Sequence, residues 1–384
     1  MLAYLGVAAS AMVAGMSFFT AALLFNRRPP WHGRARGLAV FMFVSGLASM
    51  EDVMLTSGLQ RLAPHWIGFS WPFAMLQGPA IYSYVKAITS PEPLRYTRRD
   101  LLLLGWPLLL GIALATPFYL QDGQFKIEFM ARGEAGLFSD LNLPALGVLG
   151  IIGLSLVISL AGLIAAFRLL WRHVRHVRDL FSNIEDKSLS WARWVLLILS
   201  TAWLWGVTKS GGGVLGLAPV WQEAVASVLE LGWLGTLCYF GVLQKPVFEE
   251  KLAQQAAPSE AQSTAKYSRS ALDAERMERI ADKLRRAMHE EQLFADASLS
   301  LRDLADRLGV SENYISQTLN DQLGRNFFDF VNAARVDAAK RLLREDSKTV
   351  LDVAMAVGFN SRSTFNTAFR KHAGDTPSRF RAAN

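Results

Sequence analysis

Two stretches near the C-terminus carry polar side chains on what would be the outer face of a helix. The side chains are amides, hydroxyls, one carboxylate and arginines, which are groups that hydrogen-bond to base edges in the major groove of DNA. The first stretch contributes Glu312, Asn313, Ser316, Gln317 and Asn320, and the second contributes Arg362, Ser363, Asn366, Thr367 and Arg370. Taken alone, either stretch is explained equally well by a helix face in contact with water.

Both stretches belong to a degenerate internal repeat. In each copy an amphipathic segment ends at a glycine, Gly309 or Gly358, and a second amphipathic segment follows. The matched positions are Leu304, Ala305, Leu308, Gly309, Ser311, Ile315, Leu319 and Gly324 in the first copy, and Val353, Ala354, Val357, Gly358, Ser361, Phe365, Phe369 and Gly374 in the second. Helix, tight turn and helix is the sequence form of a helix-turn-helix. Two such units in register favour a DNA reader over a solvated surface.

Local signals predict where these helices begin. Ser300 and Thr349 precede the apolar periods, and each is followed three residues later by an aspartate, which is a capping-box pattern. Ser311 and Ser361 are predicted to cap the second helix of each unit. Inside those second helices the apolar residues lie four apart and pack inward, so the two polar sets face outward.

The second copy resembles the signature of the AraC/XylS family of bacterial transcription regulators. The residues that carry the resemblance are Gly358-Phe359-Asn360-Ser361, Ser363, Phe365, Phe369, Lys371, Gly374, Thr376-Pro377 and Phe380-Arg381. The likeness covers about 110 residues, 275–381. It implies two helix-turn-helix units joined by a long linker helix, which residues 326–344 fit.

The resemblance also implies roles for side chains. Base contacts would come from the two polar sets, and phosphate contacts from Lys371, Arg379 and Arg381. The first recognition helix is not expected to bind guanine strongly, because it has no Arg or Lys between Glu312 and Leu323. A homodimer is a further expectation, since DNA sites are often paired.

The first 245 residues have a different character. Hydrophobic residues make up 51% of the chain although its C-terminal third is polar, so the excess lies toward the N-terminus. Seven apolar runs have the length of bilayer spans: residues 2–25, 37–57, 66–88, 101–120, 143–170, 191–208 and 220–243. The first run has no basic segment before it, which favours a span over a cleaved signal peptide.

The charges of the loops predict the orientation of these spans. With the N-terminus outside, eleven Lys and Arg residues fall in cytoplasmic loops and three in outside loops. This bias follows the positive-inside rule. An odd number of spans leaves the C-terminal domain in the cytoplasm, so the sequence predicts a multi-pass protein of the bacterial inner membrane.

Ionisable residues within the apolar runs are candidates for a signal-receiving site. The candidates are Glu51, Asp52 and Glu230 within the runs, and Lys209 directly after the sixth run. Charges at membrane depth are costly and usually face a partner or a cavity. The signal would be an unknown envelope ligand or membrane partner. A structural ion pair between helices, such as Glu51 or Asp52 with Lys209, explains the same residues, as do side chains that reach the interface.

The expected fold is all-α, with a seven-helix transmembrane bundle (1–244), a flexible linker (245–270) and a DNA-binding domain of two helix-turn-helix units (271–384). The expected function is regulation of transcription coupled to a membrane signal. The sequence shows no phosphate-binding glycine loop, zinc-type His/Cys spacing or nucleophile elbow, so we expect neither an enzyme nor a cofactor or metal. The alternative is a membrane receptor or transporter-like protein whose cytoplasmic helical domain binds a protein partner.

Overall fold

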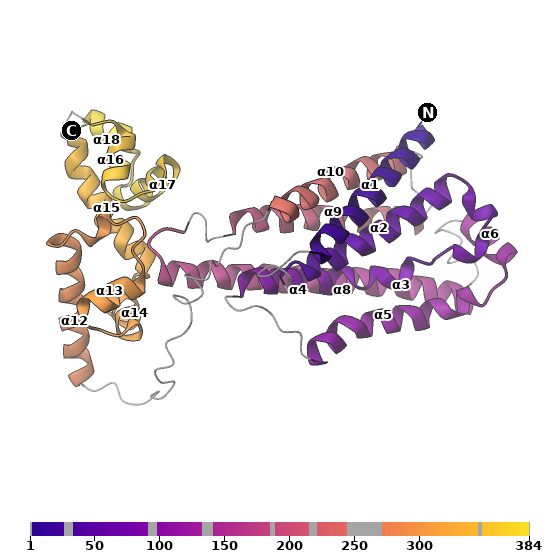
Figure 1. Ribbon diagram of the computed structural model, residues 1–384, viewed down its shortest axis with the longest axis horizontal. Helices are drawn as coiled ribbons and strands as arrows, with labels where there is room; N and C mark the ends of the chain where they lie inside the picture. The colour runs from indigo at the N-terminus through magenta and orange to yellow at the C-terminus, as the bar shows by residue number, and fades with distance from the viewer. Residues whose placement is uncertain are drawn as a thin grey trace. The chain divides into compact units, whose positions relative to one another are not determined.

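The regular structure in the computed structural model is helical throughout the residues that it describes, apart from one isolated β-bridge between Phe181 and Ser300. These residues are 2–26, 34–90, 98–132, 141–184, 189–214, 221–243, 271–344 and 348–383. The chain divides into two compact units. The first comprises Met1–Trp171 and Ser190–Val247, and the second comprises Arg172–Leu189 and Phe248–Asn384. Figure 1 shows helices α12 to α18 of the second unit in orange to yellow.

Apolar helices make up most of the first unit. They are α1 (Leu2–Phe25), α2 (Arg36–Thr56), α3 (Trp71–Ala74), α4 (Gln77–Thr89), α5 (Arg98–Tyr119), α6 (Gly123–Ala131), α8 (Leu143–Leu180), α9 (Ser190–Val214) and α10 (Trp221–Leu243). Among the described residues, three helices are long and apolar enough to cross a bilayer: Tyr4–Phe25, Arg36–Thr56 and Leu143–Leu180. The all-helical prediction is confirmed for the described residues, and three of the seven predicted spans have this support.

The third predicted span is interrupted in the structure. Residues 66–88 fall into the end of η2 (Pro64–Trp66), the four-residue α3 and the 13-residue α4. Gly68 has a φ of +85°, a left-handed conformation that ends a regular helix, and Pro72 lies in the first turn of α3. Because a bilayer span needs about 20 helical residues, α4 alone is too short to be one.

Glycines allow α4 and α8 to cross closely. A Cβ atom at Gly78 would overlap the backbone of Ile158 and Ser159, and one at Gly162 would overlap the backbone of Gly78. Small residues at a crossing let two helix backbones approach each other. This crossing positions the helices that surround the cavity described below.

Replacement of Gly162 by Val is expected to push α4 and α8 apart and to lower the melting temperature of the purified protein in detergent by several degrees. Gly153→Val is the matched control in the same helix, because nothing lies within 4 Å of a Cβ atom placed there. Thermal unfolding followed by circular dichroism measures both. Equal melting temperatures for the two variants would contradict a close crossing at Gly162.

The second unit folds around a single buried core. Its helices are α12 (Ala271–His289), α13 (Leu301–Leu308), α14 (Glu312–Asp321), α15 (Phe327–Arg344), α16 (Val350–Ala356), α17 (Arg362–Ala373) and α18 (Pro377–Ala383). Apolar side chains from α12 to α17 meet in this core, including Leu284, Leu304, Ile315, Val331 and Phe365. The predicted linker helix corresponds to α15, whose first turn is capped by Asn326, with Asp329 N donating to Asn326 Oδ1 at 2.8 Å.

Most of the predicted caps are present. Ser300 and Thr349 each form a complete capping box with the aspartate three residues later, and the Ser361 side chain accepts from Thr364 N at 3.2 Å. Ser311 occupies the N-cap position of α14, but its side chain makes no cap hydrogen bond, so that prediction is wrong. The helix starts are therefore set mainly by local sequence signals.

The end of α8 belongs to the second unit. The helix extends ten residues past the predicted span end at residue 170 and stops at Leu180. No glycine or proline occurs between Gly162 and Leu180, and His173 and Val177 are buried. A unit formed only by residues after 270 was expected, whereas the observed unit also includes Arg172–Leu189.

Candidate nucleic-acid interface

Helix α17 separates an apolar face from a polar one. Phe365 and Phe369 are fully buried, and their rings meet edge to face with centroids 5.5 Å apart. This packing fixes the rotation of the helix. The opposite face lines an open hollow of about 390 Å³, formed by Ser363, Asn366, Thr367, Arg370 and Lys371. Four of the five residues predicted to read bases from this helix therefore lie together, and the predicted phosphate contact Lys371 lies with them.

The side chains of the hollow present donors and acceptors. Arg370 is exposed, and Asn366 is half-buried at its base. Thr367 Oγ1 donates back to the Ser363 carbonyl at 3.0 Å, which leaves the hydroxyl lone pairs available. Lys371 Nζ donates to Asp329 Oδ1 at 2.6 Å, so a phosphate would compete with this carboxylate. Arg362 is exposed at the first position of α17 but does not line the hollow.

A histidine beside the hollow adds no positive charge at neutral pH. Burial lowers the pKa of His372, and the neighbouring Lys371 lowers it further. The basic character of this surface thus comes from arginine and lysine, as phosphate binding requires.

Helix α14 is arranged in the same way. Ile315 and Leu319 are buried, whereas Asn313, Gln317 and Asn320 are exposed. The two other predicted base readers, Glu312 and Ser316, are half-buried. Burial raises the pKa of Glu312, and the positive charge of Arg302 opposes this rise.

An arginine that the sequence analysis missed flanks α14. The guanidinium carbon of Arg276, from α12, lies 4.2 Å from the centroid of the Tyr314 ring, and Nη1 donates to the Tyr314 hydroxyl at 3.4 Å. Arg276 therefore brings a cation to a recognition helix that carries none of its own. The amphipathic pattern of α12 was visible in the sequence, but the pairing of Arg276 with Tyr314 depends on tertiary packing.

The two remaining phosphate candidates differ in exposure. Arg379 is exposed on α18. Arg381 is half-buried, and its Nε and Nη2 atoms are buried without a hydrogen-bond partner among the described residues. Arg379 is thus the better placed of the two to meet a phosphate.

Two of the four proposed signal residues, Glu51 and Glu230, form hydrogen bonds with other segments of the first unit. The Glu51 carboxylate accepts from Gly68 N at 2.6 Å, from Ser70 N at 3.0 Å and from the Ser70 hydroxyl, so it holds the turn before α3. Glu230 Oε1 accepts from Ser49 Oγ at 3.3 Å, which links α10 to α2. Asp52 is half-buried on α2. The side chain of Lys209 lies outside the described residues, so its ion pair with Glu51 or Asp52 stays a prediction.

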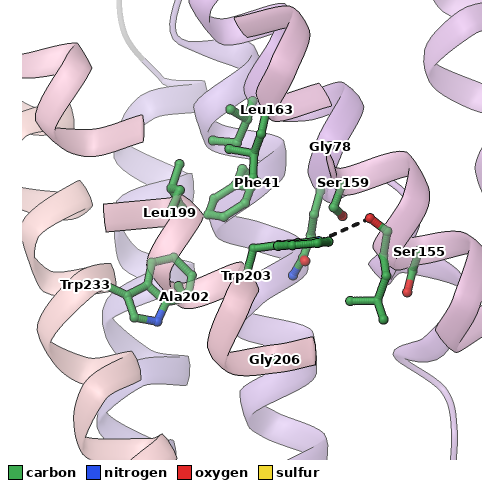
Figure 2. A pocket seen from close by; sticks show the side chains of 13 residues that line it. Phe41, Gly78, Ser155, Ser159, Leu163, Leu199, Ala202, Trp203, Gly206 and Trp233 are labelled. Carbon is green, nitrogen blue, oxygen red and sulfur yellow. Dashed lines mark hydrogen bonds between the residues drawn. The ribbon is translucent and has the colours of Figure 1, made fainter. Parts of the chain in front are cut away.

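A cavity of about 190 Å³ lies among helices α2, α4, α8, α9 and α10. Figure 2 shows the rings of Phe41, Trp203 and Trp233 around it, with Ser155 and Ser159 on the α8 side. Trp203 Nε1 donates to the Leu156 carbonyl at 3.1 Å, which ties α9 to α8 beside the cavity. No local sequence signal pointed to this site, because five helices contribute to it.

Among the described residues, no group of three or more His, Cys, Asp or Glu side chains has a metal-binding arrangement. The one cysteine, Cys238, is buried and accepts a hydrogen bond from Thr20 Oγ1 at 3.1 Å. The polar faces of α14 and α17 are the surfaces considered below for DNA binding.

The comparisons with known proteins concern the second unit. The helix-turn-helix domain family matches residues 304–383. The probable transcription factor PqrA of Proteus vulgaris is 30% identical over 92 residues, which are 24% of this chain and 75% of that protein. HTH-type transcriptional regulators of Staphylococcus aureus strains COL and MSSA476 are 29% identical over 114 residues, 30% of this chain. The chain matches only 14% of the length of these two relatives.

A solved structure is also similar in sequence. The C-terminal domain of AraT, a response regulator from Geobacillus stearothermophilus, is 26% identical, with 30% of this chain and 89% of that chain covered and a TM-score of 0.24. The matched domain and the coverage of three quarters of PqrA establish the family of the second unit. The chain belongs to the AraC-type helix-turn-helix transcription regulators.

Proposed function

We propose that this protein is a membrane-embedded transcription regulator that binds specific DNA sequences. The observation that carries the proposal is the outward face of α17, where Asn366, Arg370 and three further polar residues line one hollow. An asparagine can bond an adenine in bidentate fashion and an arginine a guanine. Arg362, Ser363 and Thr367 extend this face, and α14 offers the equivalent polar set in the other unit.

Phosphate contacts would fix the position of the DNA-binding unit on the duplex. Lys371 on α17 and Arg379 on α18 are exposed. Contacts to the backbone orient a protein on DNA, whereas contacts to base edges specify the sequence. In this arrangement, α15 spaces the two recognition helices with its 18 residues, about 27 Å of helix.

The N-terminal part is proposed to span the bacterial inner membrane seven times, with the N-terminus outside and the DNA-binding unit in the cytoplasm. The three long apolar helices support membrane embedding, and the excess of basic residues in alternate loops supports this orientation. In this proposal the end of η2, α3 and α4, which make up the interrupted segment at residues 66–88, together form one of the seven crossings. An envelope signal would change the bundle or its association into dimers and so alter how paired DNA-binding units meet a promoter.

Crosslinking of the full-length, membrane-resident protein to DNA, followed by sequencing, tests the proposal. Enrichment of a defined set of sites that is lost in an Asn366→Ala, Arg370→Ala double variant is the expected result. Absence of enrichment for the parent protein would overturn DNA reading and favour a receptor whose helical domain binds a protein. Cysteine accessibility at positions in the predicted loops tests the orientation.

The salt dependence of binding gives a further prediction. Lys371→Ala is expected to weaken binding to all DNA sequences alike and to reduce the slope of log affinity against log salt by about 1, because one phosphate contact is lost. Fluorescence anisotropy at several salt concentrations measures this slope. Lys340→Ala on α15, where Lys340 pairs with Asp337, is the control. An unchanged slope in Lys371→Ala would show that this lysine stays with Asp329 when DNA binds.

A further inference from the structure

The C-terminal end of α8 and the residues after it pack into the core of the second unit. We refer to residues 172–182 as the α8 tail. Phe181 and Ser182 are 3% and 1% exposed. Ser182 N donates to the Leu299 carbonyl at 3.1 Å, and Ser182 Oγ donates to the same carbonyl at 2.7 Å. Phe181 lies opposite Ser300, the N-cap of α13, in an antiparallel bridge.

The α8 tail also satisfies a buried charge. Arg335 of α15 is 1% exposed, and burial lowers its pKa to about 10, so the guanidinium stays charged at neutral pH. Its donors reach the carbonyls of Phe294 at 2.8 Å and Asp296 at 2.9 Å. Two further bonds, both 3.1 Å long, go to the carbonyl and the hydroxyl of Ser182. A buried charge is stable only when its hydrogen bonds are made, so Ser182 completes the site that holds Arg335.

Docking of the α8 tail leaves both recognition faces free. The hydrogen bonds and the bridge of the tail involve Leu299, Ser300 and Arg335, and the Arg178 guanidinium carbon lies 5.9 Å from the centroid of the Phe328 ring. None of these residues belongs to α14 or α17. With the tail in place, Asn313 and Gln317 on α14 and Arg362 and Arg370 on α17 stay exposed.

We infer that the surface formed by Leu299, Ser300 and Arg335 is a docking site for the α8 tail, and that the docked tail holds the DNA-binding unit in its binding-competent form. This inference rests on the proposed function for its second half. The partner is a segment of the same chain that is continuous with the long apolar helix α8. A change in the membrane bundle thus reaches the DNA-binding unit through α8 as well as through the linker at residues 245–270.

The direction of the effect follows from Arg335. This residue lies in α15, the helix that joins the two helix-turn-helix units. If the tail undocks, Arg335 loses the two acceptors of Ser182, and α15 loses part of its support. The two recognition helices are then held less firmly in register, and affinity for a two-part DNA site falls.

The test uses the full-length protein in lipid nanodiscs and a DNA fragment enriched in the crosslinking experiment described above. Ser182→Pro removes the amide and hydroxyl donors of Ser182. Arg172→Ala, an exposed position at the start of the tail, is the control. Hydrogen exchange at residues 180–183 and 294–301 reports docking without DNA. We expect exchange there to be faster in Ser182→Pro, and DNA affinity to fall about tenfold or more, with both unchanged in Arg172→Ala.

A reversible lock keeps the inference testable if Ser182→Pro fails to fold. In a Cys238→Ala background, Phe181→Cys and Ser300→Cys place two thiols on opposite sides of the antiparallel bridge, where Cα atoms are about 4.5–5.5 Å apart and a disulfide fits. The oxidised protein is expected to bind DNA at least as tightly as its own reduced form.

Three results would overturn the inference. Failure of the disulfide to form, together with fast exchange at Ser182 in the parent protein, would show that the tail does not dock. Loss of DNA binding on oxidation would show that docking blocks DNA. Equal affinities of Ser182→Pro and Arg172→Ala, despite faster exchange in the first, would remove the link to DNA. If the parent protein bound no DNA at all, the proposed function would fail with that link, while slow exchange would still establish docking.

Discussion

Asn366→Ala and Arg370→Ala are each expected to weaken binding of this protein to its DNA sites about 10- to 100-fold, and the two together more strongly. Both side chains line the hollow on α17, and loss of one good bidentate base contact costs about 1–3 kcal/mol. Each variant should also relax the preference for one base, adenine for Asn366→Ala and guanine for Arg370→Ala. Titration of sites with single base changes measures both effects.

The matched control for Arg370→Ala is Arg341→Ala. Arg341 is an exposed arginine on α15 and belongs to neither recognition helix. Its removal changes the net charge equally, so any difference between the two variants reports position and not charge. Equal losses of affinity for the two variants would contradict base reading by Arg370.

Phe365→Ala is expected to destabilise the second unit by about 3–5 kcal/mol. The ring is fully buried between Phe359 and Phe369, with centroids 5.3 Å and 5.5 Å away. This loss is a large share of the total stability of a typical domain, about 5–15 kcal/mol. The second unit should therefore populate unfolded forms, with rapid hydrogen exchange in residues 350–383 and loss of DNA binding, while the apolar helices of the first unit stay folded.

Leu351→Ala provides the comparison for that substitution. Leu351 begins the same helix-turn-helix unit but is 45% exposed, so its truncation leaves no cavity in the core. Slow exchange should persist in this variant. Similar exchange in both variants would contradict a core built on the phenylalanine cluster.

Local features of the second unit were predictable from the sequence because short-range signals determine them. The capping boxes at Ser300 and Thr349, the inward Ile315 and Phe365, and the outward polar sets all follow from helical periodicity. The raised pKa of Glu312 was not predictable, because burial of this side chain and the charges of Arg302 and Asp306 around it depend on packing against the preceding helix.

Features that depend on distant segments were missed. Arg276 meets Tyr314 across 38 residues, and Arg335 meets Ser182 across 153. The interruption at residues 66–88 was missed for the same reason: the left-handed conformation of Gly68 and the hydrogen bonds from Gly68 and Ser70 to Glu51 are features of the folded chain. Hydropathy alone counts apolar residues and does not show where a helix is broken.

The distance in sequence between Ser182 and Arg335 has a consequence for the order of biosynthesis. Arg335 leaves the ribosome 153 residues after Ser182, a delay of roughly 8–30 s at 5–20 residues per second. Helices α9 and α10 are made during that interval. The α8 tail is therefore synthesised before α9 and α10, and its partner Arg335 is synthesised after them. The contact between Ser182 and Arg335 can therefore form only after α9 and α10 have been made, so in the proposed mechanism the DNA-binding unit is completed after the apolar segment that precedes it.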